Sequence, residues 1–208
     1  MNEIRKKGGV LVFDYDGVLA NTEPLHWESW KKIFAPFLIE LTWEQYCRHC
    51  RGVEEDRMRE VIAKIFPQAN GLPDLRPYLA ARKLEVRESS LVQSPIPQRT
   101  SEMLRRLSDW RLGLVTSAER GDVEPVLREA NIQDCFEAFV FRGDVTRHKP
   151  APDSYLAIAA RMSITTGIVL EDSNAGIASA TAAGFHAVRV ADPESLPAIL
   201  SKITGIAR

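Results

Sequence analysis

The chain has 208 residues, of which 45% are hydrophobic and 26% are charged, and its formal net charge is −1. This composition predicts a globular protein with a hydrophobic core of its own and excludes a disordered chain. The balance of 27 basic and 28 acidic residues creates no overall field that favours nucleic acid or an anionic membrane, so we expect neither as a partner.

Five short apolar runs predict buried strands, because they lack the polar alternation of a half-exposed strand. Helical patterns separate these runs from residue 97 onward, and strands that alternate with helices indicate a parallel sheet in a layered α/β fold. The expected strands are 9–13, 111–116, 138–141, 167–170 and 186–190, and the expected helices are 100–109, 121–131, 153–162 and 175–183.

Residues 20–93 interrupt this alternation, because their apolar residues repeat at helical spacing and give no strand signal. One stripe includes Trp27 and Trp30, and another includes Tyr78. We interpret these stripes as packing surfaces. The segment 89–98 carries two prolines and predicts a linker that returns to the sheet. The sequence therefore predicts a helical module inserted after the first strand.

The compartment is predicted from the cysteines and from the absence of targeting signals. Three cysteines do not form a complete set of disulfides and favour a reducing compartment. We interpret Cys47 and Cys50, a C-x-x-C pair, as packing residues. We find no secretory signal and no apolar run near the about 20 residues of a membrane span. We expect a cytoplasmic protein with no obligate protein partner.

Acidic and other polar residues follow the predicted strands at the points where they end. In parallel α/β sheets, ligands bind at the carboxyl ends of the strands, so these side chains converge if their strands are neighbours. They are, in chain order, Asp14, Asp16, Thr116, Ser117, Lys149, Glu171 and Asp172.

Such a set of carboxylates indicates a cation site, because crowded carboxylates repel one another unless a cation lies among them. Oxygen ligands from few residues, completed by water, suit Mg²⁺. We expect Asp14 and Asp172 to give one carboxylate oxygen each, and Asp16 to give its backbone carbonyl. Neighbouring residues on a strand point in opposite directions, so we expect Glu171 to act through a metal-bound water.

The same residues suit the transfer of a phosphoryl group. Asp14 is a candidate nucleophile, because an aspartate with the reference pKa of about 3.9 is ionised at pH 7. Lys149 offsets the repulsion between this carboxylate and the phosphate, and Thr116 with the amide of Ser117 holds a phosphoryl oxygen. Asp16 is a candidate for proton exchange with the leaving group and with water. Each residue alone has a plain alternative role in a cap, turn or exposed loop.

The order of these motifs resembles the haloacid dehalogenase superfamily, in the subgroup that contains phosphoglycolate phosphatase and β-phosphoglucomutase. The resemblance covers most of residues 9–190 and rests on "DYDGV", "LVTS", "KPAPDSY" and "LEDSNAGIASATAAG". It implies a three-layer, Rossmann-like core of residues 1–19 and 94–208, an all-helical cap of residues 20–93, Mg²⁺ dependence and an aspartyl-phosphate intermediate.

The resemblance also assigns roles by motif position. It makes Asp14 the nucleophile, Asp16 the acid and base, Thr116 a phosphate ligand, Lys149 a charge stabiliser and Asp172 a metal ligand. Dehalogenases and phosphonoacetaldehyde hydrolases lack the second aspartate, so the resemblance favours phosphoryl chemistry.

In the cap, the resemblance makes His26 and Arg51 candidate substrate-binding residues, with packing an equal alternative for His26. Glu55 falls where a mutase would place an arginine for a second phosphate, which argues against bisphosphate handling. The expected function is therefore a phosphatase for a small phosphorylated metabolite, either a sugar phosphate or a phosphoglycolate-like acid. A phosphosugar mutase is the alternative, followed by a phospho-accepting signalling domain and a non-catalytic binding protein.

Overall fold

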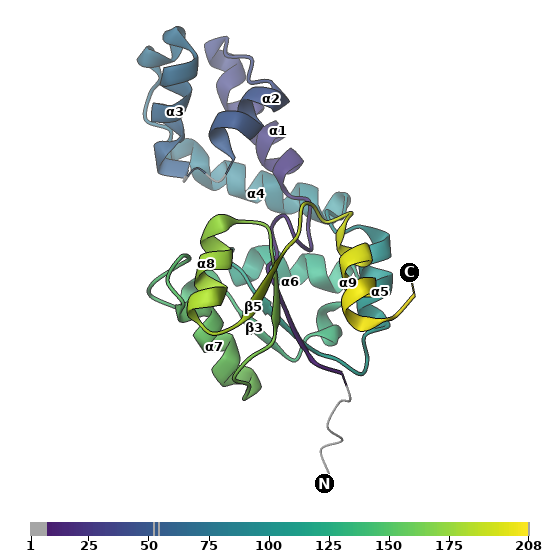
Figure 1. The fold of residues 1–208 in the computed structure, drawn as a ribbon. Helices are drawn as coiled ribbons and strands as arrows, with labels where there is room; N and C mark the ends of the chain where they lie inside the picture. The colour runs from purple at the N-terminus through teal and green to yellow at the C-terminus, as the bar shows by residue number, and fades with distance from the viewer. Residues whose placement is uncertain (1–7, 52, 54, 208) are drawn as a thin grey trace. The chain divides into compact units, whose positions relative to one another are not determined.

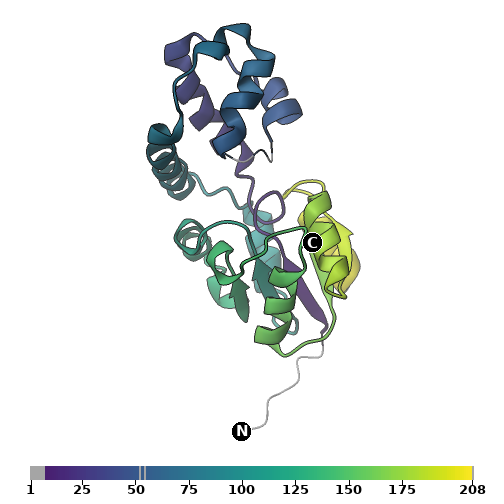
Figure 2. The same ribbon diagram turned by 90° about the vertical axis from the view of Figure 1, so that its left-hand side faces the viewer.

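The computed structural model describes residues 8–51, 53 and 55–207, and these divide into two compact units (Figures 1 and 2). The α/β unit contains residues 8–21 and 94–207, and the helical unit is Thr22–Gln93. The helical module that the sequence predicted at 20–93 thus begins at residue 22 in the structure.

A parallel sheet forms the centre of the α/β unit. Within the described residues it has five strands in the order β3-β2-β1-β4-β5, and the predicted parallel α/β fold is confirmed. The register places Phe13 of β1 opposite Leu114 of β2 and Leu170 of β4, so these three strands end close together. The strands are β1 (Val10–Phe13), β2 (Arg111–Val115), β3 (Ala138–Val140), β4 (Ile168–Glu171) and β5 (His186–Arg189).

Helices cover both faces of this sheet and give the unit three layers (Figure 1). On β1, Leu11 and Phe13 pack into the core formed with α5, α6 and α9, whereas Val12 packs into the core formed with α7 and α8. This double burial explains why β1 is apolar at successive positions. The helices are α5 (Gln98–Arg105), α6 (Arg120–Glu129), α7 (Asp153–Met162), α8 (Asn174–Ala182) and α9 (Leu196–Thr204), and the 3-10 turns are Gln133–Cys135 and Arg142–Asp144.

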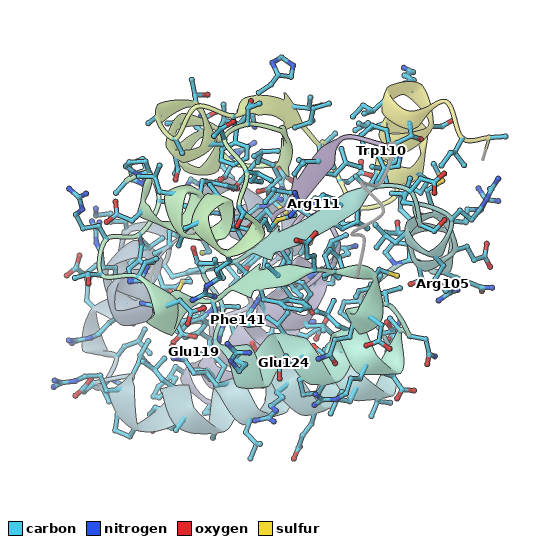
Figure 3. The ribbon with its side chains drawn as sticks, turned by 90° about the horizontal axis from the view of Figure 1, so that it is seen from below. Arg105, Trp110, Arg111, Glu119, Glu124 and Phe141 are labelled. Carbon is cyan, nitrogen blue, oxygen red and sulfur yellow. The ribbon has the colours of Figure 1, made fainter. Side chains whose placement is uncertain are left out.

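Figure 3 shows the described side chains of the chain, seen from below relative to Figure 1. Trp110 and Arg111 mark the beginning of β2, and Phe141 directly follows β3. The ring of Phe141 stacks on that of Phe139, with centroids 5.9 Å apart. The two rings are therefore packed against each other at the end of β3.

The helical unit has a hydrophobic core of its own, which includes Trp30 and Phe34 with rings stacked 5.5 Å apart. A capping box between Thr42 and Gln45 begins the short helix α2. The helices are α1 (Glu23–Phe34), α2 (Trp43–Gln45), α3 (Met58–Ile65) and α4 (Arg76–Val92), with 3-10 turns at Ala35–Phe37, Glu55–Arg57 and Pro67–Gly71 and a π-helical turn at Tyr46–Cys50.

The structure corrects three details predicted from the sequence. Helix α4 continues to Val92, so the linker back to the sheet is shorter than the predicted 89–98. The helix ends two residues before Ser94, whose helical conformation is disfavoured because Pro95 follows it. Tyr78, expected to pack, is 43% exposed, and Arg82 on the same helix is 5% exposed. Cys50 is buried as expected, whereas Cys47 is exposed.

None of the helices within the described residues is long and apolar enough to cross a membrane.

Candidate active site

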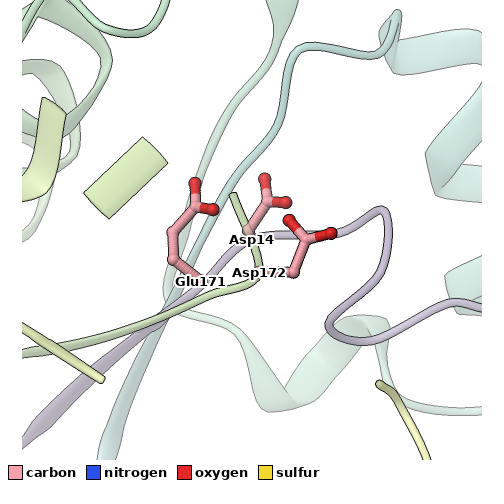
Figure 4. Close-up of side chains that lie close together, drawn as sticks. All are labelled: Asp14, Glu171 and Asp172. Carbon is pink, nitrogen blue, oxygen red and sulfur yellow. The ribbon is translucent and has the colours of Figure 1, made fainter. Parts of the chain in front are cut away.

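Three carboxylates meet where β1 and β4 end side by side. Asp14 directly follows β1, Glu171 is the last residue of β4, and Asp172 comes next. The Asp14 amide donates a hydrogen bond of 3.0 Å to the carbonyl of Leu170 and ties the two strand ends together. One carboxylate oxygen from each acid lies within 4.8 Å of the others (Figure 4).

Lys149 joins two of these acids from the loop between β3 and α7. Its ammonium nitrogen donates to Asp14 Oδ1 and to Glu171 Oε1, both at 2.6 Å, and its side chain is 10% exposed. The loop is fixed to α8, because the hydroxyl of Ser179 donates a hydrogen bond of 2.6 Å to the carbonyl of Ala151. The lysine is thus held between two carboxylates rather than extended into solvent.

Glu171 is 0% exposed and accepts four hydrogen bonds. Besides Lys149, the hydroxyl of Tyr155 donates to Oε1 at 3.0 Å, and the amide and hydroxyl of Ser173 donate to Oε2 at 3.1 and 3.0 Å. A buried carboxylate needs such donors to remain charged. Glu171 is therefore well placed to anchor Lys149, with its lone pairs already used by protein donors.

Sequence reasoning did not identify Tyr155 and Ser173 as parts of the site. Tyr155 stands in the "KPAPDSY" motif, and its ring also lies 5.4 Å from the Lys149 nitrogen. Ser173 caps α8 by accepting a hydrogen bond of 2.9 Å from the Gly176 amide. Both residues lie inside the sequence motifs quoted above, and this position was the only sequence feature that pointed to the site. A tyrosine and a serine at these positions do not by themselves predict hydrogen bonds to Glu171.

Two glycines allow the backbone to pass directly beside these carboxylates. Gly17 has φ of +77°, and a Cβ placed there would lie 2.3 Å from Asp172 Oδ2. A Cβ at Gly176 would lie 1.7 Å from Glu171 Oε1. Only glycine fits these approaches, so both residues help to define the shape of the acidic site.

The two acids bound to Lys149 differ in their proton affinity. Burial raises the pKa of Asp14 to about 8, because desolvation, with the charges of Glu171 and Asp16, outweighs the attraction of Lys149. Desolvation would also raise the pKa of Glu171, but Lys149, Ser173 and Tyr155 together hold it below its usual value. Burial tends to lower the pKa of Lys149, yet the two carboxylates raise it. The lysine is therefore cationic, and of the two acids Asp14 binds a proton more readily than Glu171.

The other predicted residues of the α/β unit lie at the same edge of the sheet. Asp16 is half-buried in the loop after β1, where a backbone bridge joins it to Ala20. Thr116 follows β2, the strand beside β1, and is 3% exposed. Its amide donates to the carbonyl of Val140 at 2.9 Å, and its hydroxyl accepts from the Ala118 amide at 3.0 Å. Ser117 is exposed.

His26 and Arg51 belong to the helical unit, which has its own polar cluster. His26 Nδ1 lies 3.0 Å from Nη2 of Arg82. A guanidinium only donates, so Nδ1 accepts and the neutral ring carries its proton on Nε2. Burial and the Arg82 charge lower the pKa of His26 to about 4. Arg82 also binds Glu55 at 2.6 Å, and Arg51 lies 3.6 Å from Glu23.

A parallel three-layer α/β fold that gathers a lysine and three carboxylates at its strand ends is the arrangement of an enzyme with an acidic active site. The sequence model of the haloacid dehalogenase-like hydrolases matches residues 11–190, and the chain belongs to this family. The resemblance predicted from the four motifs is thereby confirmed, and so is its assignment as an enzyme.

Individual relatives carry related phosphoryl activities. The chain is 30% identical over 184 residues to fructose-1-phosphate phosphatase YqaB of Escherichia coli (strain K12), covering 86% of this chain and 95% of that protein. It is 28% identical over 192 residues to beta-phosphoglucomutase of Bacillus subtilis (strain 168), covering 86% of this chain and 82% of that protein.

A solved structure supports the fold. A HAD family hydrolase from Deinococcus radiodurans R1, crystallised with bound phosphate and sodium, matches with a TM-score of 0.72 and 22% identity over 95% of this chain and 89% of that one. At this level of identity the likeness establishes the architecture, and the roles of individual residues rest on the geometry described above.

Proposed function

We propose that the protein is a Mg²⁺-dependent phosphatase that hydrolyses a small phosphorylated metabolite, a sugar phosphate or a phosphoglycolate-like acid, through an aspartyl phosphate on Asp14. The observation that carries this proposal is the contact of Lys149 with both Asp14 and Glu171 at 2.6 Å, beside Asp172. This arrangement supplies a nucleophile, a fixed cation and additional carboxylates within one cluster.

The donor set fits a hard divalent cation. Three carboxylates and one lysine leave an excess of negative charge, and the oxygens lie close enough together to share one ion. In this proposal Asp14 and Asp172 each provide a carboxylate oxygen and Asp16 its backbone carbonyl. Any contact of Glu171 with the ion passes through water, because its oxygens already accept four hydrogen bonds. The bound ion would supply positive charge against the transferring phosphoryl group.

The protein's own residues perform the two steps of hydrolysis. In the first, an oxygen of Asp14 attacks phosphorus, the ester bond breaks, and Asp16 gives its proton to the departing alkoxide. In the second, water attacks the phosphorus of the aspartyl phosphate and returns a proton to Asp16, and the bond between Asp14 and phosphorus breaks to release inorganic phosphate. Lys149 stabilises the charge on the phosphoryl oxygens, and Thr116 with the Ser117 amide positions one of them.

The relatives and the polar residues of the helical unit support the proposed class of substrate. The sugar-phosphate activity of the Escherichia coli relative favours a phosphorylated sugar over other esters. We retain His26 and Arg51 as candidate contacts to the substrate. With its proton on Nε2, His26 would act as a neutral hydrogen-bond donor to a hydroxyl or phosphate oxygen.

The test replaces Asp14 by Asn and measures phosphate release from a panel of sugar phosphates and phosphoglycolate, with Mg²⁺ and with EDTA. We expect turnover to fall to background in the variant and in EDTA, because amide nitrogen and oxygen do not form the acyl phosphate. Asp134→Asn is the matched control, since Asp134 is exposed and lies just before β3 at the opposite end of the strand. Unchanged turnover in Asp14→Asn would exclude the mechanism.

A phosphosugar mutase is the second candidate, favoured by the similarity to the Bacillus subtilis enzyme. Glu55 weighs against it, because the position expected to hold a second phosphate carries a carboxylate, which binds Arg82 at 2.6 Å and Lys83 at 3.2 Å. Incubation with β-glucose 1-phosphate separates the two functions. Formation of glucose 6-phosphate in a coupled assay indicates a mutase, whereas release of inorganic phosphate alone indicates a phosphatase.

A further inference from the structure

Arg189 holds the segment that carries Asp172. It is the last residue of β5, the edge strand that pairs with β4. Its Nη1 donates to the backbone carbonyl of Asp172 and its Nη2 donates to Oδ1 of Asn174, both at 2.5 Å. The two terminal nitrogens of one planar guanidinium thus form a bidentate contact, to the backbone on one side of Ser173 and to a side chain on the other.

The neighbouring residues of this segment are fixed by other elements. Glu171 is held by Lys149 and Tyr155, and Ser173 is held by Glu171 and by the first turn of α8. Arg189 adds a contact from β5, the strand that pairs with β4. The backbone that directs the Asp172 side chain is therefore held by β5 in addition to the contacts of its neighbouring residues.

We propose that Arg189 is a positioning residue for Asp172, which it keeps oriented towards Asp14 so that both carboxylates bind the same cation. The inference rests on the proposed function, because it concerns the Mg²⁺ site. Its hydrogen bonds go to the carbonyl and to Asn174, so its effect on the cation is indirect and acts through the backbone.

Charge and position act in opposite directions at this residue, which makes the inference testable. A guanidinium near a cation site repels the cation, so loss of its charge alone would strengthen Mg²⁺ binding. Loss of the bidentate contact would weaken Mg²⁺ binding, because Asp172 is no longer preorganised. Arg189→Met removes both the charge and the bidentate contact, whereas Arg189→Lys keeps the charge and loses the bidentate contact.

The experiment measures Mg²⁺ affinity by isothermal titration calorimetry and, separately, phosphate release against Mg²⁺ concentration. We expect Arg189→Met and Arg189→Lys to weaken Mg²⁺ binding by about three- to tenfold, the range for loss of one or two exposed charge-assisted hydrogen bonds. At saturating Mg²⁺ we expect kcat to stay within about twofold of the wild type, as for a residue that acts through a ligand. Asn174→Ala removes one of the two contacts and should have a smaller effect in the same direction.

Arg161→Met is the matched control, because Arg161 also binds one backbone carbonyl and one side-chain oxygen, those of Phe139 and Asp144. Its Mg²⁺ affinity should equal that of the wild type. Equal or tighter binding in Arg189→Met, with a folded protein by circular dichroism, would overturn the inference. If Arg189→Met does not fold, Arg189→Lys decides alone. A wild type that binds no Mg²⁺ would overturn the proposed function together with the inference, whereas binding that the variants leave unchanged would overturn the inference alone.

Discussion

Replacing Gly176 by Ala is a sharp test of the acidic site, because the usual effect of this change has the opposite sign. Gly176 lies in the first turn of α8, and alanine in place of a helical glycine normally stabilises a protein by about 1 kcal/mol. Here the new Cβ would lie 1.7 Å from Oε1, 1.9 Å from Cδ and 2.2 Å from Oε2 of Glu171. The carboxylate of Glu171 therefore has to move.

The cost follows from what holds Glu171 in place. Overpacking a buried site typically costs about 1–3 kcal/mol, and separating a buried carboxylate from its cation costs about 3–5 kcal/mol. We expect partial movement, a net loss of about 3 kcal/mol in the free energy of unfolding, and a melting temperature lower by roughly 6–12 °C for a chain of this length. Activity should fall at least about hundredfold, because Lys149 loses one of its two anchors.

Differential scanning calorimetry and the phosphate-release assay measure both effects. Gly143→Ala is the control, since a Cβ at Gly143 meets no atom within 4 Å, and it should leave stability within about 1 kcal/mol and activity intact. A Gly176→Ala protein as stable and as active as the wild type would refute the placement of Glu171. Loss of activity with unchanged stability would show that the carboxylate moves without strain and would refute only the energetic estimate.

Three further predictions address other contacts. Tyr155→Phe removes a buried donor to Glu171 and should cost about 1.5–3 kcal/mol in unfolding free energy. The control Tyr78→Phe, at an exposed tyrosine, should cost less than about 0.5 kcal/mol. Equal losses of the two variants in urea titrations would contradict the prediction for Tyr155. The pKa of His26 is lowered to about 4, so the unfolded chain binds more protons than the folded one between pH 6.5 and 4. The free energy of unfolding should therefore fall by about 2–3 kcal/mol as the pH drops through this range. The fluorescence of the three tryptophans of the helical unit, Trp27, Trp30 and Trp43, reports the unfolding, and His26→Asn should show a flatter pH dependence. Because burial raises the pKa of Asp14 to about 8, addition of Mg²⁺ at pH 7 should release protons, up to one per protein. Calorimetry in buffers of different ionisation enthalpy detects this release, and Asp14→Asn should not show it.

The sequence was informative where a pattern has a single physical solution. Apolar runs without polar alternation required burial on both faces, and Leu11, Val12 and Phe13 are each 0% exposed between two helical layers. Parallel strands bring their carboxyl ends to one edge, which was enough to expect Asp14, Lys149 and Asp172 near one another.

The sequence was uninformative where a contact depends on how distant segments pack. Arg82 reads as an exposed helical arginine, yet it is 5% exposed because Glu55, His26 and the face of Trp30 surround it. The position of Arg189 in the sequence indicates only a polar residue at the end of a strand. Its hydrogen bond to Asn174 depends on the pairing of β5 with β4. Helical periodicity and strand alternation describe one element at a time, so neither reveals such a partner.

The division of roles between Asp14 and Glu171 follows from their different donors rather than from their charge. Lys149 contacts both acids at the same distance of 2.6 Å, so the lysine alone cannot distinguish them. Glu171 gains three further donors from Tyr155 and Ser173, which keep its charge satisfied within the protein. Burial raises the pKa of Asp14 although Lys149 stabilises its ionised form, so additional positive charge would stabilise that form further. A carboxylate in that condition is suited to bind a cation and attack phosphorus, and one in the condition of Glu171 is suited to hold a lysine still.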